Sequence, residues 1–454
     1  MAKTTTRFVC SNCGAMFSSW AGKCSQCGEW NTLQEEVVSA TGGAPGQVAS
    51  HGAVLKTQSI SASLKNDRPR MTTGMSEVDT VLGGGIVTGS VVLIAGQPGI
   101  GKSTLLLQLA SLAAAKQRVL YVSGEESDHQ VGMRAKRLGA DKARGLQLAT
   151  SNSADDIAAT INSKAYDLVI VDSIQTVAVN AVSLAAGSIS QITNSAGILL
   201  AAGKQSGTAV VLVGHVTKEG MIAGPKVLEH IVDVVLQLEG DAYGGFKVLR
   251  ATKNRFGPTS EAAILEMVEE GLQPVLNPSA SLLAERQISD GSVVLATLEG
   301  TRPLLVEVQA LVNKTSYGYP KRAASGIDLN RVNVLIAMLE RRTKLRLSDQ
   351  DIYINIVGGI RLSDPAADLA VCMAIGSAAK GLQLKRNAVV FGEVGLSGEV
   401  RHVPFIEKRI AEAKKLGFDG AVGPALTARG KATKDPFLYV VKDVRTALNE
   451  FLEK

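Results

Sequence analysis

Hydrophobic residues between positions 90 and 215 gather in short runs separated by longer segments of mixed polarity. The runs are Ser90–Ala95, Arg118–Ser123, Leu168–Val171 and Ala209–Val213. A glycine or a polar residue follows each run at once, and Leu105–Ala115, behind the first run, is typical of a helix. Apolar runs of this length that alternate with helices indicate an α/β fold whose parallel sheet is buried on both faces.

From about Leu276 the pattern changes to strands mixed with alanine-rich helices, which predicts a second α/β domain. Its segments are Gly291–Glu299, Leu304–Val312, Asn330–Leu339, Ile352–Val357, Pro365–Ala379 and Pro404–Leu416. We therefore expect four parts: a cysteine-rich segment over 1–32, a small, polar and flexible linker over 33–67, a core over 68–272 and a second domain over 276–454.

The composition excludes several classes of protein. With 45% hydrophobic and 20% charged residues, the chain of 454 residues is neither disordered nor fibrous. Its longest apolar runs are far below the roughly 18 residues of a membrane span. Residues 1–10 lack the apolar core of a secretory signal, so we expect a cytoplasmic protein without disulfides. The net charge of +6 permits an acidic partner such as nucleic acid but does not require one.

Four of the five cysteines lie near the start of the chain as two C-x-x-C pairs. The pairs are Cys10 with Cys13 and Cys24 with Cys27, and a glycine follows each. Two such pairs bring four thiolates to one tetrahedral metal ion, for which Zn²⁺ is the first choice. Because all four ligand positions are filled, the zinc is expected to be structural. The alternative is a redox-active C-x-x-C, and Cys372 is expected to be a core residue.

A glycine-rich loop joins the first apolar run to the helix behind it. The sequence Gly96-Gln97-Pro98-Gly99-Ile100-Gly101-Lys102-Ser103 matches G-x-x-x-x-G-K-[ST], and Thr104 follows it. In this context backbone N–H groups converge on phosphate oxygens, Lys102 brings a charge to the terminal phosphates, and Ser103 can ligate Mg²⁺. The sequence therefore predicts a P-loop that binds a nucleoside triphosphate.

Polar residues follow the other predicted strands, at the edge where open α/β sheets bind ligands. Glu125 and Glu126 follow the second run; one could orient the attacking water, or both could cap the next helix. Asp172 closes the third run, as a magnesium-positioning carboxylate requires. His215 closes the fourth and is either a sensor of the terminal phosphate or a hydrogen-bonded structural residue.

These features together resemble one family. Gly83-Gly84-Gly85, the P-loop and the polar residues after the strands are similar to the RecA-type ATPase core of ring helicases and KaiC-like proteins. With the four-cysteine segment and Lys253-Asn254-Arg255-Phe256-Gly257, nearly the whole chain resembles the bacterial RadA (Sms) family of DNA repair and recombination ATPases. The resemblance implies a RecA-like core, a zinc ribbon-like N-terminal domain, and ATP, Mg²⁺ and Zn²⁺ as cofactors.

The resemblance also implies roles for individual residues. Glu125 is the expected catalytic carboxylate with Glu126 beside it, and Asp172 is expected to position magnesium and water. Lys253 and Arg255 are expected to act near nucleotide or DNA at a subunit boundary. An arginine supplied in trans can accelerate hydrolysis by roughly 10³–10⁵. A phosphate contact to DNA and a solvated basic turn are the alternatives for this motif.

The segment Thr217–Glu229 is basic and interrupted by glycines. In the RecA-like architecture the corresponding loop faces the central channel of the ring and contacts single-stranded DNA. We therefore expect Lys218 and Lys226 to contact DNA phosphates, and a surface loop without this role is the alternative.

The C-terminal domain resembles the proteolytic domain of Lon, chiefly over Ser363–Asp368 and Phe391–Val400. The nucleophilic serine of Lon falls among residues 364–368, which include Ala366 and no serine, and its lysine base falls on or next to Arg409. Alanine cannot attack a carbonyl and a guanidinium cannot act as a base, so we expect no peptidase activity. The alternative is a displaced dyad that uses Ser363, Ser397 or Lys408.

A dense basic cluster in this domain contains Arg341, Arg342 and Lys344. It could track a DNA backbone or be a solvated helix end, and ring assembly is another role for the domain. The expected function is a DNA-dependent motor on single-stranded and branched DNA that forms a homo-hexamer and works with a RecA-type recombinase. A nucleotide-gated scaffold of the KaiC kind and, less well supported, an ATP-dependent protease are the alternatives.

Overall fold

The structure is a computed structural model. It describes residues 4–11, 15–39, 57, 59, 70–215, 227–240, 245–316, 318–428, 431–433 and 435–453. The contacts between residues divide the chain into two units, Met1–Asp67 and Arg68–Lys454. None of the helices in the described residues is long and apolar enough to span a membrane.

The N-terminal unit contains a three-stranded antiparallel sheet in the order β2-β1-β3. Its strands are β1 (Thr4–Cys10), β2 (Met16–Phe17) and β3 (Leu33–Ser39). Cys10, Cys24 and Leu33 are buried together. The expectation that the linker begins at residue 33 is therefore wrong for residues 33–39, because β3 pairs with β1 along its whole length and buries Leu33 beside the cysteines.

The second unit begins with a nine-stranded sheet in the order β12-β11-β10-β9-β4-β8-β7-β5-β6. From β9 to β6 neighbouring strands are parallel, and β10, β11 and β12 are added antiparallel. The strands are β4 (Val91–Gly96), β5 (Val119–Ser123), β6 (Leu146–Thr150), β7 (Leu168–Asp172), β8 (Ala209–His215), β9 (Val234–Gly240), β10 (Phe246–Asn254), β11 (Ala262–Val268) and β12 (Gly271–Pro274).

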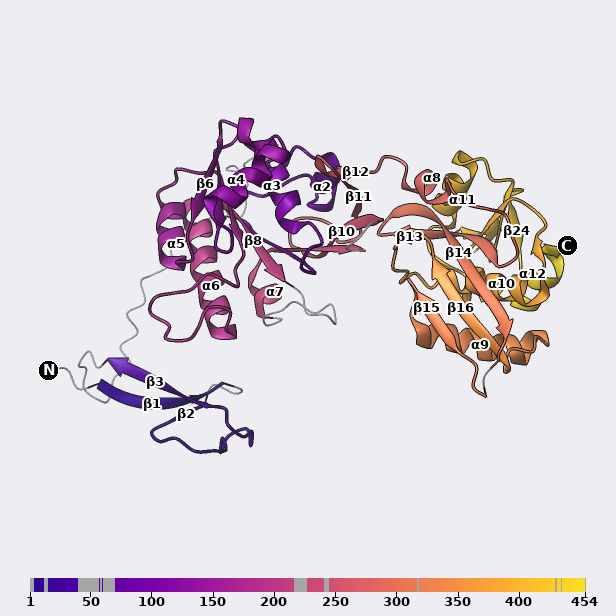
Figure 1. The fold of residues 1–454 in the computed structure, drawn as a ribbon, viewed down its shortest axis with the longest axis horizontal. Helices are drawn as coiled ribbons and strands as arrows, with labels where there is room; N and C mark the ends of the chain where they lie inside the picture. The colour runs from indigo at the N-terminus through magenta and orange to yellow at the C-terminus, as the bar shows by residue number, and fades with distance from the viewer. Residues whose placement is uncertain are drawn as a thin grey trace. The chain divides into compact units, whose positions relative to one another are not determined.

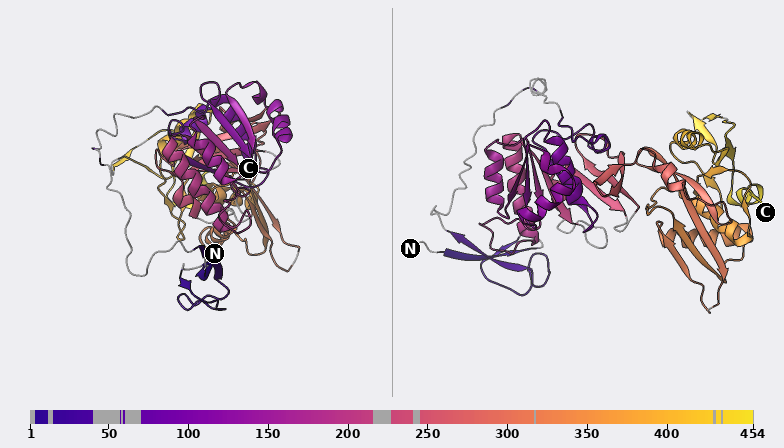
Figure 2. Two further views of the ribbon diagram at one scale, coloured as in Figure 1. Left: turned by 90° about the vertical axis from the view of Figure 1, so that its left-hand side faces the viewer. Right: turned by 45° about the horizontal axis from the view of Figure 1, so that its top comes forward.

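Helices cover both faces of this sheet (Figure 1). One face packs against α2 (Ser76–Val81), α3 (Lys102–Ala113) and α4 (Asp128–Arg137). The other packs against α5 (Ala154–Asn162), α6 (Ile189–Ser206) and α7 (Val227–Ile231), and α5 and α6 lie side by side (Figure 2). Along β4 the side chains alternate between the two cores, which explains the continuous apolar run in the sequence.

The C-terminal domain has a seven-stranded sheet in the order β15-β16-β14-β13-β18-β21-β24. Its central helix, α10 (Ala367–Lys380), is buried along most of its length, and Cys372 is a core residue as predicted. The sheet strands are β13 (Ser292–Glu299), β14 (Arg302–Lys314), β15 (Arg322–Ser325), β16 (Gln350–Ile356), β18 (Ala388–Val390), β21 (Gly420–Gly423) and β24 (Leu438–Val440). The helices are α8 (Pro278–Leu283), α9 (Leu329–Thr343), α10 (Ala367–Lys380), α11 (Ile406–Lys415) and α12 (Val444–Glu450).

Candidate nucleotide and metal sites

The P-loop connects the end of β4 to the start of α3. Gly99 and Gly101 have φ angles of +78° and +110°, which residues with a side chain rarely adopt. Gly96 has no room for a side chain, because a Cβ there would lie 2.7 Å from the carbonyl oxygen of Leu238. Ser103 and Thr104 lie in the first turn of α3. The glycines thus permit the tight turn that aims backbone N–H groups at a phosphate.

Lys102 is buried at the base of this loop. Its ammonium group donates hydrogen bonds to the carbonyl oxygens of Gly96 and Gln97, at 2.9 and 3.0 Å. Burial lowers the pKa of Lys102, and the negative charges of Asp172 and Glu125 oppose that effect. The ammonium group is therefore held beside the loop, next to carboxylates that favour its charged form.

Glu125 and His215 form one side of the site. The Nε2 atom of His215 lies 3.5 Å from the Glu125 carboxylate, and its Nδ1 atom lies 3.3 Å from the Lys102 ammonium nitrogen. The hydroxyl of Ser173 donates a hydrogen bond to Glu125. The structure thus joins the ends of β4, β5, β7 and β8 around the P-loop, and it brings together the residues that the sequence predicts there.

Glu126 makes different contacts from those of Glu125. Its carboxylate lies 2.5 Å from the guanidinium of Arg134 on α4, and its backbone exchanges hydrogen bonds with the Ser123 hydroxyl. These bonds give Glu126 a partner in the adjacent helix, whereas Glu125 contacts His215 and Ser173. The sequence places the two glutamates side by side and cannot distinguish them.

Asp172 is buried at the end of β7 and accepts a hydrogen bond of 2.5 Å from the hydroxyl of Tyr121. Burial raises the pKa of Tyr121 well above its ordinary value, and the nearby Asp172 charge adds to this. The phenol therefore stays protonated and donates to the carboxylate. Tyr121 lies inside an apolar run, so its contact with Asp172 could not be predicted from the sequence.

The Lys253–Gly257 motif lies at the other end of the strands. Asn254 on β10 pairs with Val234 on β9, and Val234 pairs with Val92 near the start of β4. The P-loop follows Gly96, at the end of β4, which is about 13 Å further along the strand. Within one chain the motif therefore lies at one end of the strands and the P-loop at the other end.

Each basic residue of the motif has partners in the same chain. The Lys253 ammonium donates to the carbonyl oxygens of Glu229, His230 and Val232, at 2.6, 3.2 and 2.8 Å. Burial lowers the pKa of Lys253, and the charge of Arg255 adds to this shift. Arg255 lies 3.3 Å from the buried Asp233 carboxylate. Lys253 therefore caps α7, while about half of the Arg255 side chain stays exposed.

The zinc site is formed by cysteines from both C-x-x-C pairs. The sulfur atoms of Cys10, Cys24 and Cys27 all lie within 4.8 Å of one another, and those of Cys10 and Cys27 are 3.7 Å apart. Four sulfurs at about 2.3 Å from one zinc ion are about 3.8 Å apart, so the described thiols fit Zn²⁺. The fourth expected ligand, Cys13, lies outside the described residues.

Removal of zinc is expected to unfold the N-terminal sheet alone. The cluster around Cys10, Cys24 and Leu33 is too small to hold three strands without the metal. A strong chelator, or Cys24→Ser, should therefore abolish the amide exchange protection of β1, β2 and β3 and leave that of β4 and β7 unchanged. The same protection pattern with and without zinc would contradict a structural role for the metal.

The other predicted DNA contacts are less defined. Lys218 and Lys226 lie outside the described residues. Arg341, Arg342 and Lys344 are exposed at the end of α9. Arg341 and Arg342 line a hollow of about 320 Å³ with Arg445, a basic residue from α12 that sequence reasoning missed because it is remote in the chain.

In the region that resembles Lon, Ala366 is buried at the start of α10 and Arg409 is completely buried. The guanidinium of Arg409 lies 2.8 Å from the Asp364 carboxylate and donates to the carbonyl oxygens of Ala296 and Pro404, at 2.6 and 3.2 Å. Burial lowers the pKa of Arg409, while Asp364 opposes that shift. Arg409 is thus a buried cation whose guanidinium is held by one carboxylate and two backbone carbonyl oxygens.

The fold and these sites define a RecA-like P-loop ATPase with an N-terminal zinc ribbon and an α/β C-terminal domain; ATP, Mg²⁺ and Zn²⁺ are its cofactors. Family models match residues 65–221 (AAA domain), 8–35 (rubredoxin metal binding domain) and 318–426 (subunit ChlI of Mg-chelatase). The chain belongs to the RadA family of DNA repair proteins, as the resemblance in the sequence predicts.

Three relatives, each named DNA repair protein RadA, illustrate the similarity. The protein of Brucella abortus is 48% identical, and the match covers 96% of this chain and 94% of the relative. That of Pseudomonas aeruginosa is 45% identical over 100% of both chains. That of Escherichia coli is 43% identical over 99% of both chains. The matches therefore extend over nearly the whole length of this chain and of each relative.

Proposed function

We propose that the protein is a DNA-dependent ATPase that assembles into a ring on single-stranded DNA and promotes branch migration of recombination intermediates. Glu125 activates the attacking water, Asp172 and Ser103 hold Mg²⁺, and Lys102 neutralises the phosphates. His215 links Glu125 to Lys102 and is placed to respond to the terminal phosphate. The proposal also includes DNA contacts by Lys218 and Lys226 and a RecA-type recombinase as partner.

One observation carries the assembly part of this proposal. Lys253 and Arg255 lie at the end of the strands that is opposite to the P-loop. A contact between this motif and a triphosphate therefore needs a second copy of the chain. The exposed half of Arg255 is available for such a contact, and an arginine acting in trans is a known device of phosphoryl transfer. Lys253, which is bonded to three carbonyl oxygens, positions α7 instead.

Mixing two inactive variants tests this arrangement. Lys102→Ala removes the P-loop charge and Arg255→Ala removes the trans arginine, so each variant alone should have little ATPase activity. In a mixed ring, an intact P-loop can receive an intact arginine from its neighbour. An equal mixture should therefore recover up to about a quarter of the wild-type rate, because one interface in four combines both intact parts. A mixture as inactive as either variant would remove the trans role of Arg255.

Branch migration is tested with a three-stranded junction whose arms can be extended. The wild-type protein should lengthen the heteroduplex only when ATP is present and hydrolysed. Hydrolysis without any movement of the junction would favour the alternative, a nucleotide-gated scaffold. The buried Arg409 and the alanine at position 366 support the absence of peptidase chemistry in either case.

The basic cluster at the end of α9 is expected to contact the DNA backbone. The affinity for single-stranded DNA falls as the salt concentration rises. Changing Arg341, Arg342 and Lys344 together to Ala should make this dependence weaker, so that the negative slope of log affinity against log salt becomes smaller in magnitude by about 2. ATP binding in the absence of DNA should not change. Titrations at several salt concentrations measure this slope, and an unchanged slope would assign the DNA contacts to other residues.

A further inference from the structure

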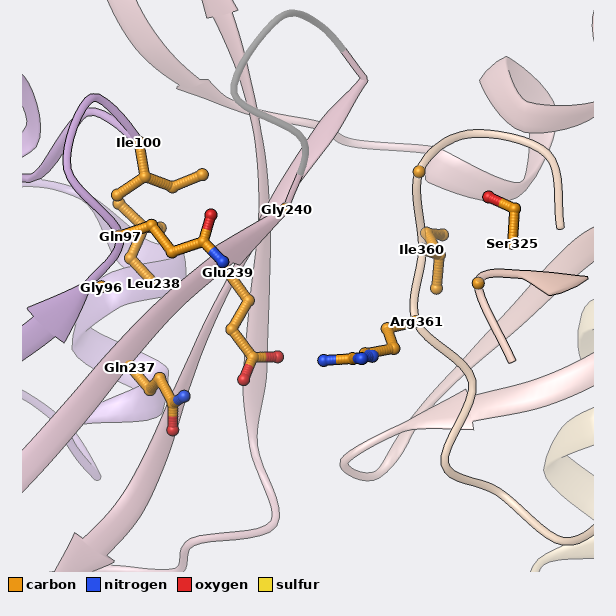
Figure 3. A pocket seen from close by; sticks show the side chains of 12 residues that line it. Gly96, Gln97, Ile100, Gln237, Leu238, Glu239, Gly240, Ser325, Ile360 and Arg361 are labelled. Carbon is orange, nitrogen blue, oxygen red and sulfur yellow. The ribbon is translucent and has the colours of Figure 1, made fainter. Parts of the chain in front are cut away.

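A cavity of about 290 Å³ opens beside the P-loop (Figure 3). One wall consists of Gly96, Gln97 and Ile100 of the P-loop. The end of β9, residues 237–240, forms the floor. The opposite wall comes from the C-terminal domain, with Ser325, Gly326 and residues 359–361. Segments that are far apart in the sequence therefore share this cavity.

Contacts between partly buried groups link the C-terminal wall to the ATPase core. The Arg250 guanidinium on β10 lies 2.9 Å from the carboxylate of Glu299 on β13 and 3.4 Å from that of Glu239 on β9. Glu299 is buried, and removing one partner of such a pair is costly. Gly245 packs on the backbone of Gly358, where a Cβ would lie 2.9 Å from the carbonyl oxygen. The C-terminal wall of the cavity is thus held by contacts with the ATPase core of the same chain.

The lining has the chemistry that a nucleoside requires. Ile100, Leu238 and Ile360 line the cavity with apolar atoms and are almost completely buried, so the apolar surface that they leave for a base is small. Gln97 and Gln237 offer amides that can bond to base edges, as Gln does in nucleic-acid recognition. The phosphates of a nucleotide have their own place on the adjoining P-loop, so the cavity is needed for the nucleoside alone.

Two charged residues face each other across the cavity. In Figure 3 the Arg361 side chain extends from the C-terminal domain toward the Glu239 carboxylate. A guanidinium plane stacks well on a base, and a carboxylate at the end of a strand is a suitable acceptor for ribose hydroxyls. Arg361 is exposed, so the cavity is open to a ligand on this side.

We propose that this cavity holds the nucleoside of the bound ATP, so that the C-terminal domain completes the nucleotide site of its own chain through Arg361. The inference rests on the proposed function, since it takes ATP as the ligand of the P-loop. It gives the C-terminal domain a role besides DNA contact and assembly. Nucleotide occupancy and the position of this domain are then coupled, because both sides of the cavity contact the same ligand.

The test compares ATP with inorganic triphosphate, which lacks the nucleoside. Full-length protein carrying Glu125→Gln, to prevent turnover, is loaded with labelled ATP and Mg²⁺, and each unlabelled competitor displaces the label. Adding Arg361→Ala should weaken ATP about 10-fold and leave the affinity for triphosphate unchanged. Lys380→Ala, which removes a charge from an exposed position outside the cavity, should change neither affinity.

Three results would overturn the inference. The first is an ATP affinity of the Arg361→Ala protein equal to that of its parent. The second is an equal loss for ATP and triphosphate, which would indicate a general effect on the P-loop. The third is a parent protein that binds triphosphate as tightly as ATP, because the nucleoside then contributes nothing. A parent protein that binds neither would refute the proposed ATPase function itself, together with this inference.

Discussion

Glu125→Gln is expected to lower ATP turnover by about 10²–10⁴-fold and to leave ATP binding intact. The Glu125 carboxylate is the one that lies next to His215 and accepts a hydrogen bond from Ser173, at the edge of the sheet where the phosphates bind. The amide has nearly the same shape but cannot take a proton from water. Single-turnover hydrolysis and binding of labelled ATP measure the two effects separately.

Glu126→Gln is the matched control for this prediction. Glu126 has the same chemistry and the adjacent position, but it pairs with Arg134 on α4. We expect the Glu126→Gln protein to turn over ATP at least about 10-fold faster than the Glu125→Gln protein. The change at Glu126 weakens a partly exposed ion pair and removes no base. Equal losses in the two variants, or a greater loss in Glu126→Gln, would reverse the assignment of the catalytic carboxylate.

Arg409→Met is expected to destabilise the C-terminal domain by about 3–5 kcal/mol. The change leaves the Asp364 carboxylate without its buried partner and removes two hydrogen bonds to backbone carbonyl oxygens. Amide exchange of α10 and β13 reports this directly, since residues in the core exchange through unfolding of the domain. The exchange should accelerate by about 10²–10⁴-fold, while β4 and β7 in the ATPase core stay protected.

Arg401→Met is the matched control for this loss of stability. Arg401 also pairs with a carboxylate, that of Glu399 at 2.6 Å, but both side chains are largely exposed. Such a pair contributes less than about 1 kcal/mol. Equally small effects of Arg409→Met and Arg401→Met would show that Arg409 does not stabilise the domain.

The strands that carry the nucleotide site could be predicted from the sequence because they are buried on both faces. Val91–Gly96 and Leu168–Asp172 are continuous apolar runs, and their ends place the P-loop and Asp172 at one edge. Leu146–Thr150 carries no such signal, because it is the edge strand β6 and several of its side chains are exposed. The strand β3 cannot be predicted from its own residues, because its role depends on pairing with β1.

Contacts between distant residues could not be predicted in the same way. Glu125 and Glu126 differ through Arg134, His215 and Ser173, which approach them only after folding. The position of Lys253 opposite the P-loop follows from the register of β10 on β9. Arg361 lines the same cavity as the P-loop although more than 250 positions separate them in the sequence. A sequence motif identifies the chemistry of a residue, but it does not show at which end of the strands the residue lies.

The most direct measurement is steady-state ATP hydrolysis by the purified protein with and without single-stranded DNA, beside a Lys102→Ala control. Lys102 is the buried P-loop cation, so its loss should remove hydrolysis at this site and leave only contaminating activity. We predict hydrolysis that single-stranded DNA stimulates and that the Lys102→Ala protein lacks both with and without DNA. Hydrolysis that depends on Lys102 but is indifferent to DNA would contradict a DNA-dependent motor.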